Sequence, residues 1–344
     1  MDPRIPVTVL TGYLGAGKTT LLNRILGEEH GRRYAVIVNE FGEIGIDGDL
    51  IASGDEELFE MNNGCVCCTV RGDLIRTLHG LVHRNAGGAG RFDAVIVETT
   101  GLADPGPVAQ TFFVDPLLQE HFVLDSVTTV VDARHIDLRL DDSREAAEQI
   151  AFADQIVLNK TDLVGERELP EIESRLRRIN PLAPIHRAQR AQLSLDRILG
   201  RGGFDLSRMQ SLEPQFPGAG EPGDAGHVHD EHCGHETPGH EHRHDDDITS
   251  VSLASARPMD RAALIGWLEA LIAAQGRNIL RLKGIIDLHA EPQRFVVQGV
   301  HMLLEGELQR AWKPGEARAS RLVLIGRKLD APSLQAGFDS CAVA

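Results

Sequence analysis

The stretch that decides the fold is IPVTVLTGYLGAGKTT, residues 5–20. A run of apolar and β-branched residues leads directly into a glycine-rich turn, and a helical pattern follows the turn. This order matches G-x-x-x-x-G-K-[ST] between a strand and a helix, the pattern of a phosphate-binding loop. Glycines let successive backbone N–H groups turn toward phosphate oxygens, and the helix N-terminus adds a favourable dipole. The stretch therefore predicts a nucleotide site.

Each residue type in this loop has an expected role. Lys18 is expected to reach the β- and γ-phosphates, and the hydroxyl of Thr19 is expected to bind Mg²⁺. Both belong to the expected catalytic set. The residues expected to bind the nucleotide here are Gly12, Gly15, Ala16, Gly17, Lys18, Thr19 and Thr20.

A second element is DAVIVETTG, residues 93–101. It is a buried apolar strand that ends in Glu98, whose carboxylate is expected beside the loop, where it can hold Mg²⁺ or its water. The backbone N–H of Gly101 is expected to contact the γ-phosphate. Such a strand end is a weak signal by itself, and it gains weight from its distance after the phosphate-binding loop.

A third element, NKTD, identifies the base. Asn159, Lys160 and Asp162 follow the apolar run QIVL. A carboxylate such as Asp162 can accept hydrogen bonds from N1–H and the 2-amino group of guanine. Adenine lacks both donors and would leave a buried charge unpaired, which is costly. The expected nucleotide is therefore GTP.

Short apolar runs alternate with helical patterns through the first two hundred residues. Strands buried on both faces and separated by helices are typical of a doubly wound, mostly parallel sheet. The sequence thus predicts an α/β fold. The expected strands are Ile5–Leu10, Tyr34–Val38, Ala94–Val97, Val127–Val131, Gln155–Leu158 and Ala183–His186, and expected helices include Leu21–Leu26, Leu74–Val82 and Leu169–Ile179.

The alternation ends near Gly200, which divides the chain into three parts. Residues 1–200 form the expected GTPase domain, and residues 201–247 are rich in Gly, Pro, Asp, Glu and His, which predicts a flexible acidic linker. Residues 248–344 form a smaller expected α+β domain. Its expected elements are a strand at 248–255, a helix over Asp260–Ala274 and strands at Ile279–Ile286, Arg294–Gly299 and Arg321–Ile325.

Composition excludes several classes of partner. The chain has 344 residues and a net charge of −16, and half of that charge lies between Glu221 and Asp247, where nine acidic residues accompany one basic residue. Nucleic acid binding favours a basic face, so no nucleic-acid partner is expected. No apolar run reaches the ~18–20 residues that a membrane span needs, and the N-terminus has no signal-peptide pattern. We therefore expect a cytoplasmic protein without a membrane partner.

Three of the five cysteines lie in NNGCVCCTV, residues 62–70. A redox pair is disfavoured, because Cys67 and Cys68 are adjacent and a disulfide between neighbours is strained. Structural burial is a further alternative. Two or three thiolates from one turn, completed by ligands from elsewhere, suit Zn²⁺ and tolerate Co²⁺. The expected metal ligands are Cys65, Cys67 and Cys68.

With GYLGAGKTT, NEFGEIGID (39–47), GCVCCTV (64–70), ETTGLADP (98–105) and NKTD in this order, the chain resembles the CobW-type P-loop GTPases, which are related to CobW, HypB and UreG. The stretch KGIIDL…FVVQGVH…W…SRLVLIGRKLD (283–330) is similar to that family's C-terminal domain. The resemblance implies a GTP-hydrolysing metallochaperone or metal-insertion protein for zinc, cobalt or a related metal.

Such a protein delivers its metal to a client metalloprotein under GTP/GDP control. The segment NEFGEIGIDG corresponds in position to a switch loop, where Glu40 is a candidate metal ligand and Glu43 or Asp47 a candidate water-positioning residue. Three alternatives stay open: a metal-storage or buffering protein, a cobalt-handling GTPase of cobalamin synthesis, and a redox-sensing regulatory GTPase. The sequence leaves the oligomeric state open between a monomer and a nucleotide- or metal-dependent dimer.

The linker contains HVHDEHCGHETPGHEHRHDDD, residues 227–247, with seven histidines and Cys233. Imidazoles in such tracts bind zinc, nickel or cobalt loosely. A flexible linker of some forty residues has an r.m.s. span of roughly 35–40 Å, enough to reach the cysteines. The tract is therefore expected to load metal onto them, and the alternative is a solvated acidic linker without that role.

Overall fold

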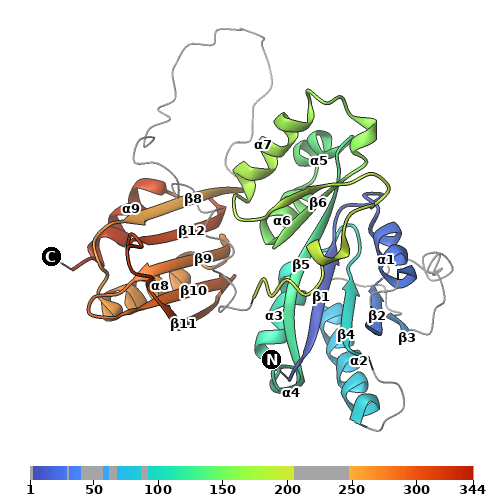
Figure 1. Ribbon diagram of the computed structural model, residues 1–344, viewed down its shortest axis with the longest axis horizontal. Helices are drawn as coiled ribbons and strands as arrows, with labels where there is room; N and C mark the ends of the chain where they lie inside the picture. Colours follow the sequence, from blue (N-terminus) through green and yellow to red (C-terminus); the bar gives the residue numbers. More distant parts are fainter. Residues whose placement is uncertain are drawn as a thin grey trace.

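The computed structural model describes residues 3–28, 31–39, 57–61, 68–86, 92–204 and 248–343, which form two β-sheets with helices packed around them (Figure 1). Glu40, Glu43, Cys65, Cys67 and the histidine tract lie outside these ranges. Within the described ranges, no helix combines the length and the apolar character needed to cross a membrane.

The first sheet carries the residues predicted to bind the nucleotide. Its described strands follow the order β3-β2-β4-β1-β5-β6-β7, and every neighbouring pair is parallel. This confirms the predicted α/β fold with a parallel sheet. The strands are β1 (Ile5–Thr11), β2 (Tyr34–Asn39), β3 (Glu57–Met61), β4 (Ala94–Glu98), β5 (Phe122–Asp132), β6 (Gln155–Asn159) and β7 (Ile185–Arg187).

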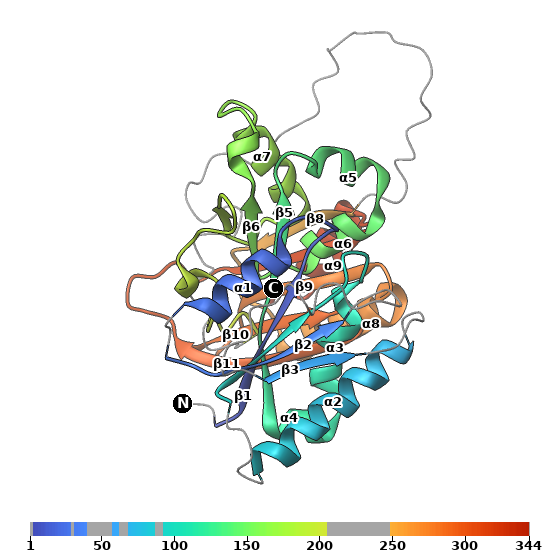
Figure 2. The same cartoon turned by 90° about the vertical axis from the view of Figure 1, so that its right-hand side faces the viewer.

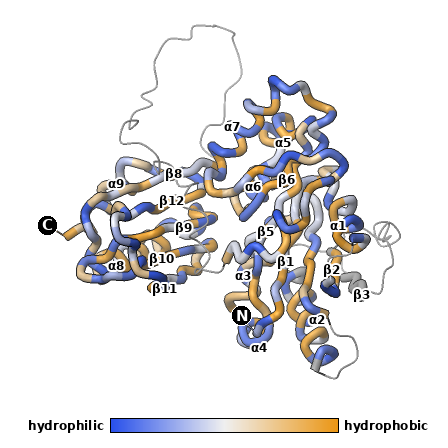
Figure 3. Tube along the Cα trace, viewed as in Figure 1, coloured by the Kyte–Doolittle hydropathy of each residue, from blue (hydrophilic) through white to orange (hydrophobic). Residues whose placement is uncertain are grey.

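Successive side chains of a strand point to opposite faces of the sheet, and in this sheet the side chains on both faces are apolar. In β4, for example, Val95 and Val97 face one cluster of buried residues, whereas Ile96 faces another. The hydropathy colouring in Figure 3 shows the same apolar character along the central strands of the sheet. Burial on both faces explains why the central strands are visible in the sequence as nearly continuous apolar runs.

The helices cover the two faces unequally. One face packs against α1 (Lys18–Gly27) and residues 188–199, and the other packs against the remaining helices of the domain. Figure 2 shows α1 in front of the strands. The helices on the second face are α2 (Cys68–Ala86), α3 (Pro105–Val114), α4 (Pro116–His121), α5 (Ile136–Asp142), α6 (Arg144–Phe152) and α7 (Leu169–Ile179).

The second sheet is antiparallel, with the described strand order β11-β10-β9-β12-β8. A helix predicted to begin at Asp260 begins one residue later, because the Asp260 carboxylate caps it by accepting from the N–H of Ala263 at 2.8 Å. The elements are β8 (Ile248–Ser255), α8 (Arg261–Gln275), β9 (Ile279–Asp287), β10 (Gln293–Val300), β11 (Leu303–Ala311), β12 (Ser320–Arg327) and α9 (Ala331–Ser340).

The second sheet is buried between its own helices and the first domain. In β12, Leu322 and Leu324 pack toward the cluster that includes α8 and α9, whereas Val323 and Ile325 join the large apolar cluster of the first domain. Strand β9 contacts α6, β8 contacts α7 and β10 contacts α3. A continuous apolar core therefore joins the two domains, which disfavours independent domain motion.

Buried ions cross the same interface. Asp154, just before β6, pairs with Arg281 and with Lys283, whose Nζ lies 2.9 Å from its Oδ1. The three side chains are only 2–4% exposed. Burial, followed by the charge of Arg281, lowers the pKa of Lys283 to about 8. Burial would raise the pKa of Asp154, but the two cations outweigh it and hold that pKa below its ordinary value.

The first residues after Gly200 are held in this interface. The N–H of Gly202 donates to Asp125 Oδ1 at 2.8 Å, and the carbonyl of Gly203 accepts from Lys283 Nζ at 2.8 Å. Phe204 is buried, and its carbonyl accepts from Gln298 at 2.9 Å. The chain is thus fixed to both domains as far as Phe204, four residues into the segment assigned to the linker from its composition.

We predict that Asp154→Asn lowers the free energy of unfolding by about 3–5 kcal/mol, because Arg281 and Lys283 are then buried without a charged partner. Chemical denaturation of the full chain measures this loss. Asp93→Asn is the matched control, since Asp93 pairs with Arg33 on the surface, where its side chain is 46% exposed, and a loss within about 1 kcal/mol is expected. Equal losses in the two variants would contradict a stabilising role for the buried cluster.

Candidate functional site

The phosphate-binding loop joins β1 to α1 through three glycines with positive φ angles. These angles are 140° at Gly12, 73° at Gly15 and 108° at Gly17, values that residues with a side chain rarely adopt. Gly12 also lies against β5, and a Cβ atom added to it would stand 2.2 Å from the carbonyl oxygen of Val130. Glycine is therefore required here both for backbone conformation and for packing.

Lys18 and Thr19 begin α1 and lie at the mouth of the loop. The Lys18 side chain is buried, and its Nζ donates to the carbonyl oxygen of Gly12 at 2.9 Å. Its charge thus lies across the loop, where the phosphates of a nucleotide are expected. Ala16 is buried inside the loop, whereas Thr20 is exposed on α1.

Glu98 is brought beside the loop by the pairing of β4 with β1. Leu10 and Glu98 are register partners, and the N–H of Thr99 donates to the carbonyl of Leu10 at 2.9 Å. The Thr19 hydroxyl donates to Glu98 Oε1 at 3.4 Å. A hydroxyl and a carboxylate at adjacent positions are the oxygen ligands that Mg²⁺ prefers, so these two residues fit a Mg²⁺ site.

Gly101 lies directly against the phosphate-binding loop. A Cβ atom added to it would stand 2.6 Å from the backbone nitrogen of Leu14. Gln149, on α6, holds the same segment by donating to the carbonyls of Gly101 and Ala103, each at 3.1 Å. The structure therefore brings the segment after Glu98 into contact with the loop, as the γ-phosphate role predicted for Gly101 requires.

The side chain of Asn159 connects the phosphate-binding loop to the segment that follows β7. Its Nδ2 donates to the carbonyl of Ala16 at 3.0 Å, and its Oδ1 accepts from the N–H of Ala191 at 2.8 Å. Lys160 Nζ donates to Asp132 Oδ2 at 2.8 Å. Asp162 is exposed, in a short 3₁₀ helix over Thr161–Leu163. Of these motif residues, Asp162 presents the most accessible side chain to a base.

Residues 189–192 form a tight turn beside the NKTD motif that the sequence analysis missed. Arg190 and Ala191 have φ angles of 49° and 58°, and the N–H of Gln192 donates to the carbonyl of Gln189 at 2.9 Å. Two central residues with positive φ define a type I′ turn, which usually contains Gly or Asn. The left-handed conformation costs about 1–2 kcal/mol per residue here. With neither Gly nor Asn present, the turn left no signal in the sequence.

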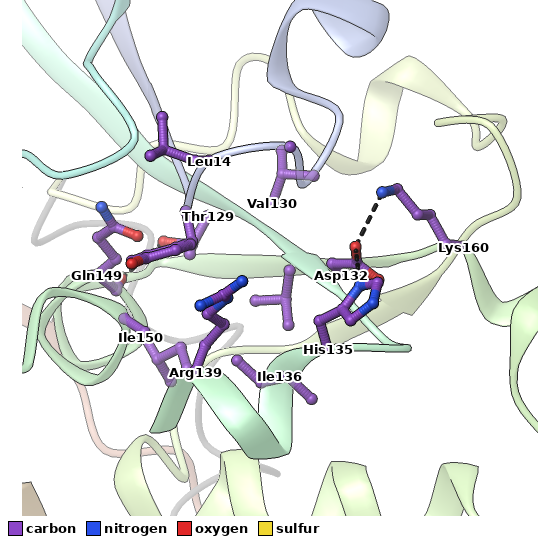
Figure 4. A pocket seen from close by; sticks show the side chains of 14 residues that line it. Leu14, Thr129, Val130, Asp132, His135, Ile136, Arg139, Gln149, Ile150 and Lys160 are labelled. Atoms are coloured by element: carbon purple, nitrogen blue, oxygen red, sulfur yellow. Dashed lines mark hydrogen bonds and ion pairs between the residues drawn. The ribbon is translucent and has the colours of Figure 1, made fainter. Parts of the chain in front are cut away.

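A cavity of about 270 Å³ opens between the phosphate-binding loop and helices α5 and α6 (Figure 4). Tyr13 and Leu14 line it from the loop, and the guanidinium of Arg139 lies 5.1 Å from the centre of the Tyr13 ring. On the opposite side, His135 Nδ1 lies 3.0 Å from Asp132 Oδ2, the oxygen that also accepts from Lys160. The cavity is therefore lined in part by the phosphate-binding loop.

The predicted metal ligands fall largely outside the described residues. Cys68 is the first residue of α2, whereas Glu40, Cys65 and Cys67 lie beyond the described ranges, as does the catalytic candidate Glu43. Among the described residues, no group of three or more His, Cys, Asp and Glu side chains is placed to hold a metal ion. Cys341 is buried in the second domain, and burial raises the pKa of its thiol.

A parallel sheet with a glycine-rich loop after its central strand, a carboxylate beside Thr19 and NKTD after β6 defines a P-loop GTPase. The CobW/HypB/UreG nucleotide-binding domain matches residues 6–187, and the cobalamin synthesis protein CobW C-terminal domain matches residues 248–342. The chain belongs to this CobW/HypB/UreG family, as its resemblance to CobW-type GTPases indicated.

Two relatives and one solved structure show how far the similarity extends. The zinc chaperone YjiA of Escherichia coli K12 is 35% identical over 98% of both chains. The zinc-regulated GTPase metalloprotein activator 1 of Schizosaccharomyces pombe is 41% identical over 62% of this chain and 53% of its own. The crystal structure of Zn(II)-bound YjiA GTPase from E. coli has a TM-score of 0.75 at 30% identity and covers all of both chains.

We predict that Gly101→Ala lowers GTP affinity about 10- to 100-fold, because the added methyl group collides with the loop backbone at Leu14. Equilibrium titration with a fluorescent GTP analogue measures the effect. Gly80→Ala on α2 is the matched control, since its Cβ meets nothing within 4 Å, and we expect unchanged affinity with slightly higher stability. A GTP affinity in Gly101→Ala equal to that of the wild type would contradict the prediction, because the loop would then accommodate the added methyl group without cost.

Proposed function

We propose that this GTPase is a metallochaperone that binds zinc through Cys65, Cys67 and Cys68 and releases it to a client protein under GTP/GDP control. The observation that carries the proposal is the shared edge of the sheet. Strand β2 ends at Asn39, the register partner of Met61, where β3 ends, and α2 begins at Cys68. The cysteine segment therefore follows the carboxyl end of β3 in the chain, as the phosphate-binding loop follows the carboxyl end of the parallel strand β1.

Cysteine chemistry supports the metal role. Thiolates are the ligands of soft tetrahedral zinc sites, and Co²⁺ can occupy the same kind of site. A residue at the start of a helix lies at the positive end of the helix dipole, which favours the thiolate form. Cys68 has that place on α2. Glu40 is the proposed additional ligand, and residues 227–244 are proposed to load the site with metal.

The relatives support zinc as the metal. The names of the E. coli and S. pombe proteins describe them as a zinc chaperone and a zinc-regulated GTPase. A second E. coli structure is described as a zinc-bound variant in which one glutamate and two cysteines are replaced by alanine. Zinc bound to that variant must contact other residues, so a test on this chain has to separate cysteine-dependent binding from the rest.

Nucleotide binding is proposed to follow the predicted roles. Asp162 accepts from N1–H and the 2-amino group of guanine, and Lys18 neutralises the β- and γ-phosphates. Thr19 and Glu98 hold Mg²⁺, and Glu43 is proposed to position the attacking water. Coupling between the two sites is proposed to run through residues 39–47, and a coupling free energy of ~1–3 kcal/mol changes metal affinity ~5–150-fold.

We predict tighter zinc binding with a non-hydrolysable GTP analogue than with GDP, by at least fivefold, because metal and nucleotide stabilise the same state of the switch segment. A competition titration with zinc and cobalt in the presence of Mg²⁺ measures both affinities and the preferred ion. The Cys65/Cys67/Cys68→Ser variant should lose the tight site. Cys341→Ala is the control, because this cysteine is buried in the second domain, and it should keep the tight site.

Two outcomes would contradict the proposal. Loose binding that survives the triple cysteine change and ignores the nucleotide would favour a metal-buffering protein. Control of GTP hydrolysis by mild oxidation in the absence of metal would favour a redox-sensing GTPase. Preference for cobalt over zinc would support a metallochaperone under nucleotide control whose client belongs to cobalamin synthesis.

A further inference from the structure

The left-handed turn at residues 189–192 is tied to the base-binding motif. The backbone N–H and the hydroxyl of Thr161 both donate to the carbonyl of Ala188, at 3.2 and 3.1 Å. Thr161 immediately precedes Asp162, the residue proposed to contact guanine. The turn therefore lies beside the place where a purine would bind.

Arg24 connects α1 to this turn. Its Nη1 donates to the carbonyl of Ala191 at 2.6 Å, and its Nε donates to Glu28 Oε1 at 2.5 Å. Asn159 accepts from the N–H of the same Ala191 at 2.8 Å. The N–H of Ala191 is therefore bound by the amide of Asn159 on β6, and its carbonyl is bound by the guanidinium of Arg24 on α1.

Recognition of guanine also needs a hydrogen-bond donor for O6, which the Asp162 carboxylate cannot provide. The Asp162 carboxylate accepts hydrogen bonds and so can pair with N1–H and the 2-amino group, whereas O6 of guanine is itself an acceptor. Lys160 is engaged with Asp132 at 2.8 Å. Within the turn, the N–H of Ala191 donates to Asn159 and that of Gln192 donates to Gln189. We therefore assign the contact with O6 to the N–H of Arg190, the other central residue of the turn, in its left-handed conformation.

We propose that Arg24 is a positioning residue for base recognition, which holds the 189–192 turn in the conformation that donates to O6 of guanine. The proposal rests on the proposed contact between Asp162 and the opposite edge of the base. An arginine suits this role because its planar fork can donate to the Ala191 carbonyl and to Glu28 at once. A lysine cannot reproduce that fixed pair of donors.

The test compares three nucleotides in the full-length protein: GTP, 6-thio-GTP and ITP. In 6-thio-GTP a sulfur, a weaker acceptor, replaces O6, while N1–H and the 2-amino group remain. ITP keeps O6 and lacks the 2-amino group. Arg24→Ala should lower the preference for GTP over 6-thio-GTP about fivefold, the contribution of one hydrogen bond, and leave the preference for GTP over ITP unchanged.

Other variants separate the possible causes of failure. Asp162→Ala should reduce the preference for GTP over ITP, so an unchanged value there would refute the proposed Asp162 contact and not the role of Arg24. Arg33→Ala removes the same charge from a surface pair with Asp93 and should change neither preference. Arg24→Lys should lose part of the preference over 6-thio-GTP, and it supplies the measurement if Arg24→Ala does not fold.

A rescue experiment tests the strain directly. Glycine adopts a positive φ without cost, so Ala191→Gly added to Arg24→Ala should restore the preference for GTP over 6-thio-GTP. Affinity for GTP and 6-thio-GTP that falls in equal proportion in Arg24→Ala would overturn the proposal, because Arg24 would then support only α1 and the phosphate-binding loop. Unchanged affinity for both nucleotides would overturn it as well.

Discussion

The nucleotide site depends on one buried amide, that of Asn159. This side chain is 2% exposed and holds the phosphate-binding loop through Ala16 and the base-side turn through Ala191. The contact with the loop is so close that a Cβ atom on Gly17 would stand 2.5 Å from Nδ2. One position must supply both a donor and an acceptor, which an amide does and a carboxylate or an aliphatic side chain does not. Loss of either bond leaves a buried peptide group unpaired, at a cost of about 1–3 kcal/mol.

Strict requirements of this kind on single residues also explain which parts of the structure could be predicted from the sequence. The phosphate-binding loop was predictable because positive φ angles and contact with Val130 leave glycine as the fitting residue. The central strands were predictable because burial on both faces demands continuous apolar runs. The placement of Thr19 beside Glu98 also followed from the sequence, since both positions are fixed by the ends of neighbouring elements.

What escaped prediction lacks such a compositional signal. Among the described strands, β3 and β11 lie at the edges of their sheets. The residues of β11 are exposed or half-buried, and its sequence, LLEGELQRA, lacks the continuous apolar run of the central strands. The 189–192 turn uses Arg and Ala where Gly or Asn is usual, because hydrogen bonds from distant residues hold it. The interface ions were equally hidden, since the pairing of Asp154 with Arg281 and Lys283 joins residues more than 120 positions apart.

The contact network also explains how the two domains depend on each other. The segment after Glu98 touches the phosphate-binding loop at Gly101, and a few residues later it touches the second domain, where a Cβ atom on Gly106 would stand 2.5 Å from His301 Nε2. The His301 ring in turn lies 5.0 Å from that of Phe152 on α6. Close-packed contacts of this kind shift between discrete arrangements and do not deform continuously. A displacement of Gly101 that accompanies a change of nucleotide therefore has to be accommodated within a segment whose far end is packed against the second domain.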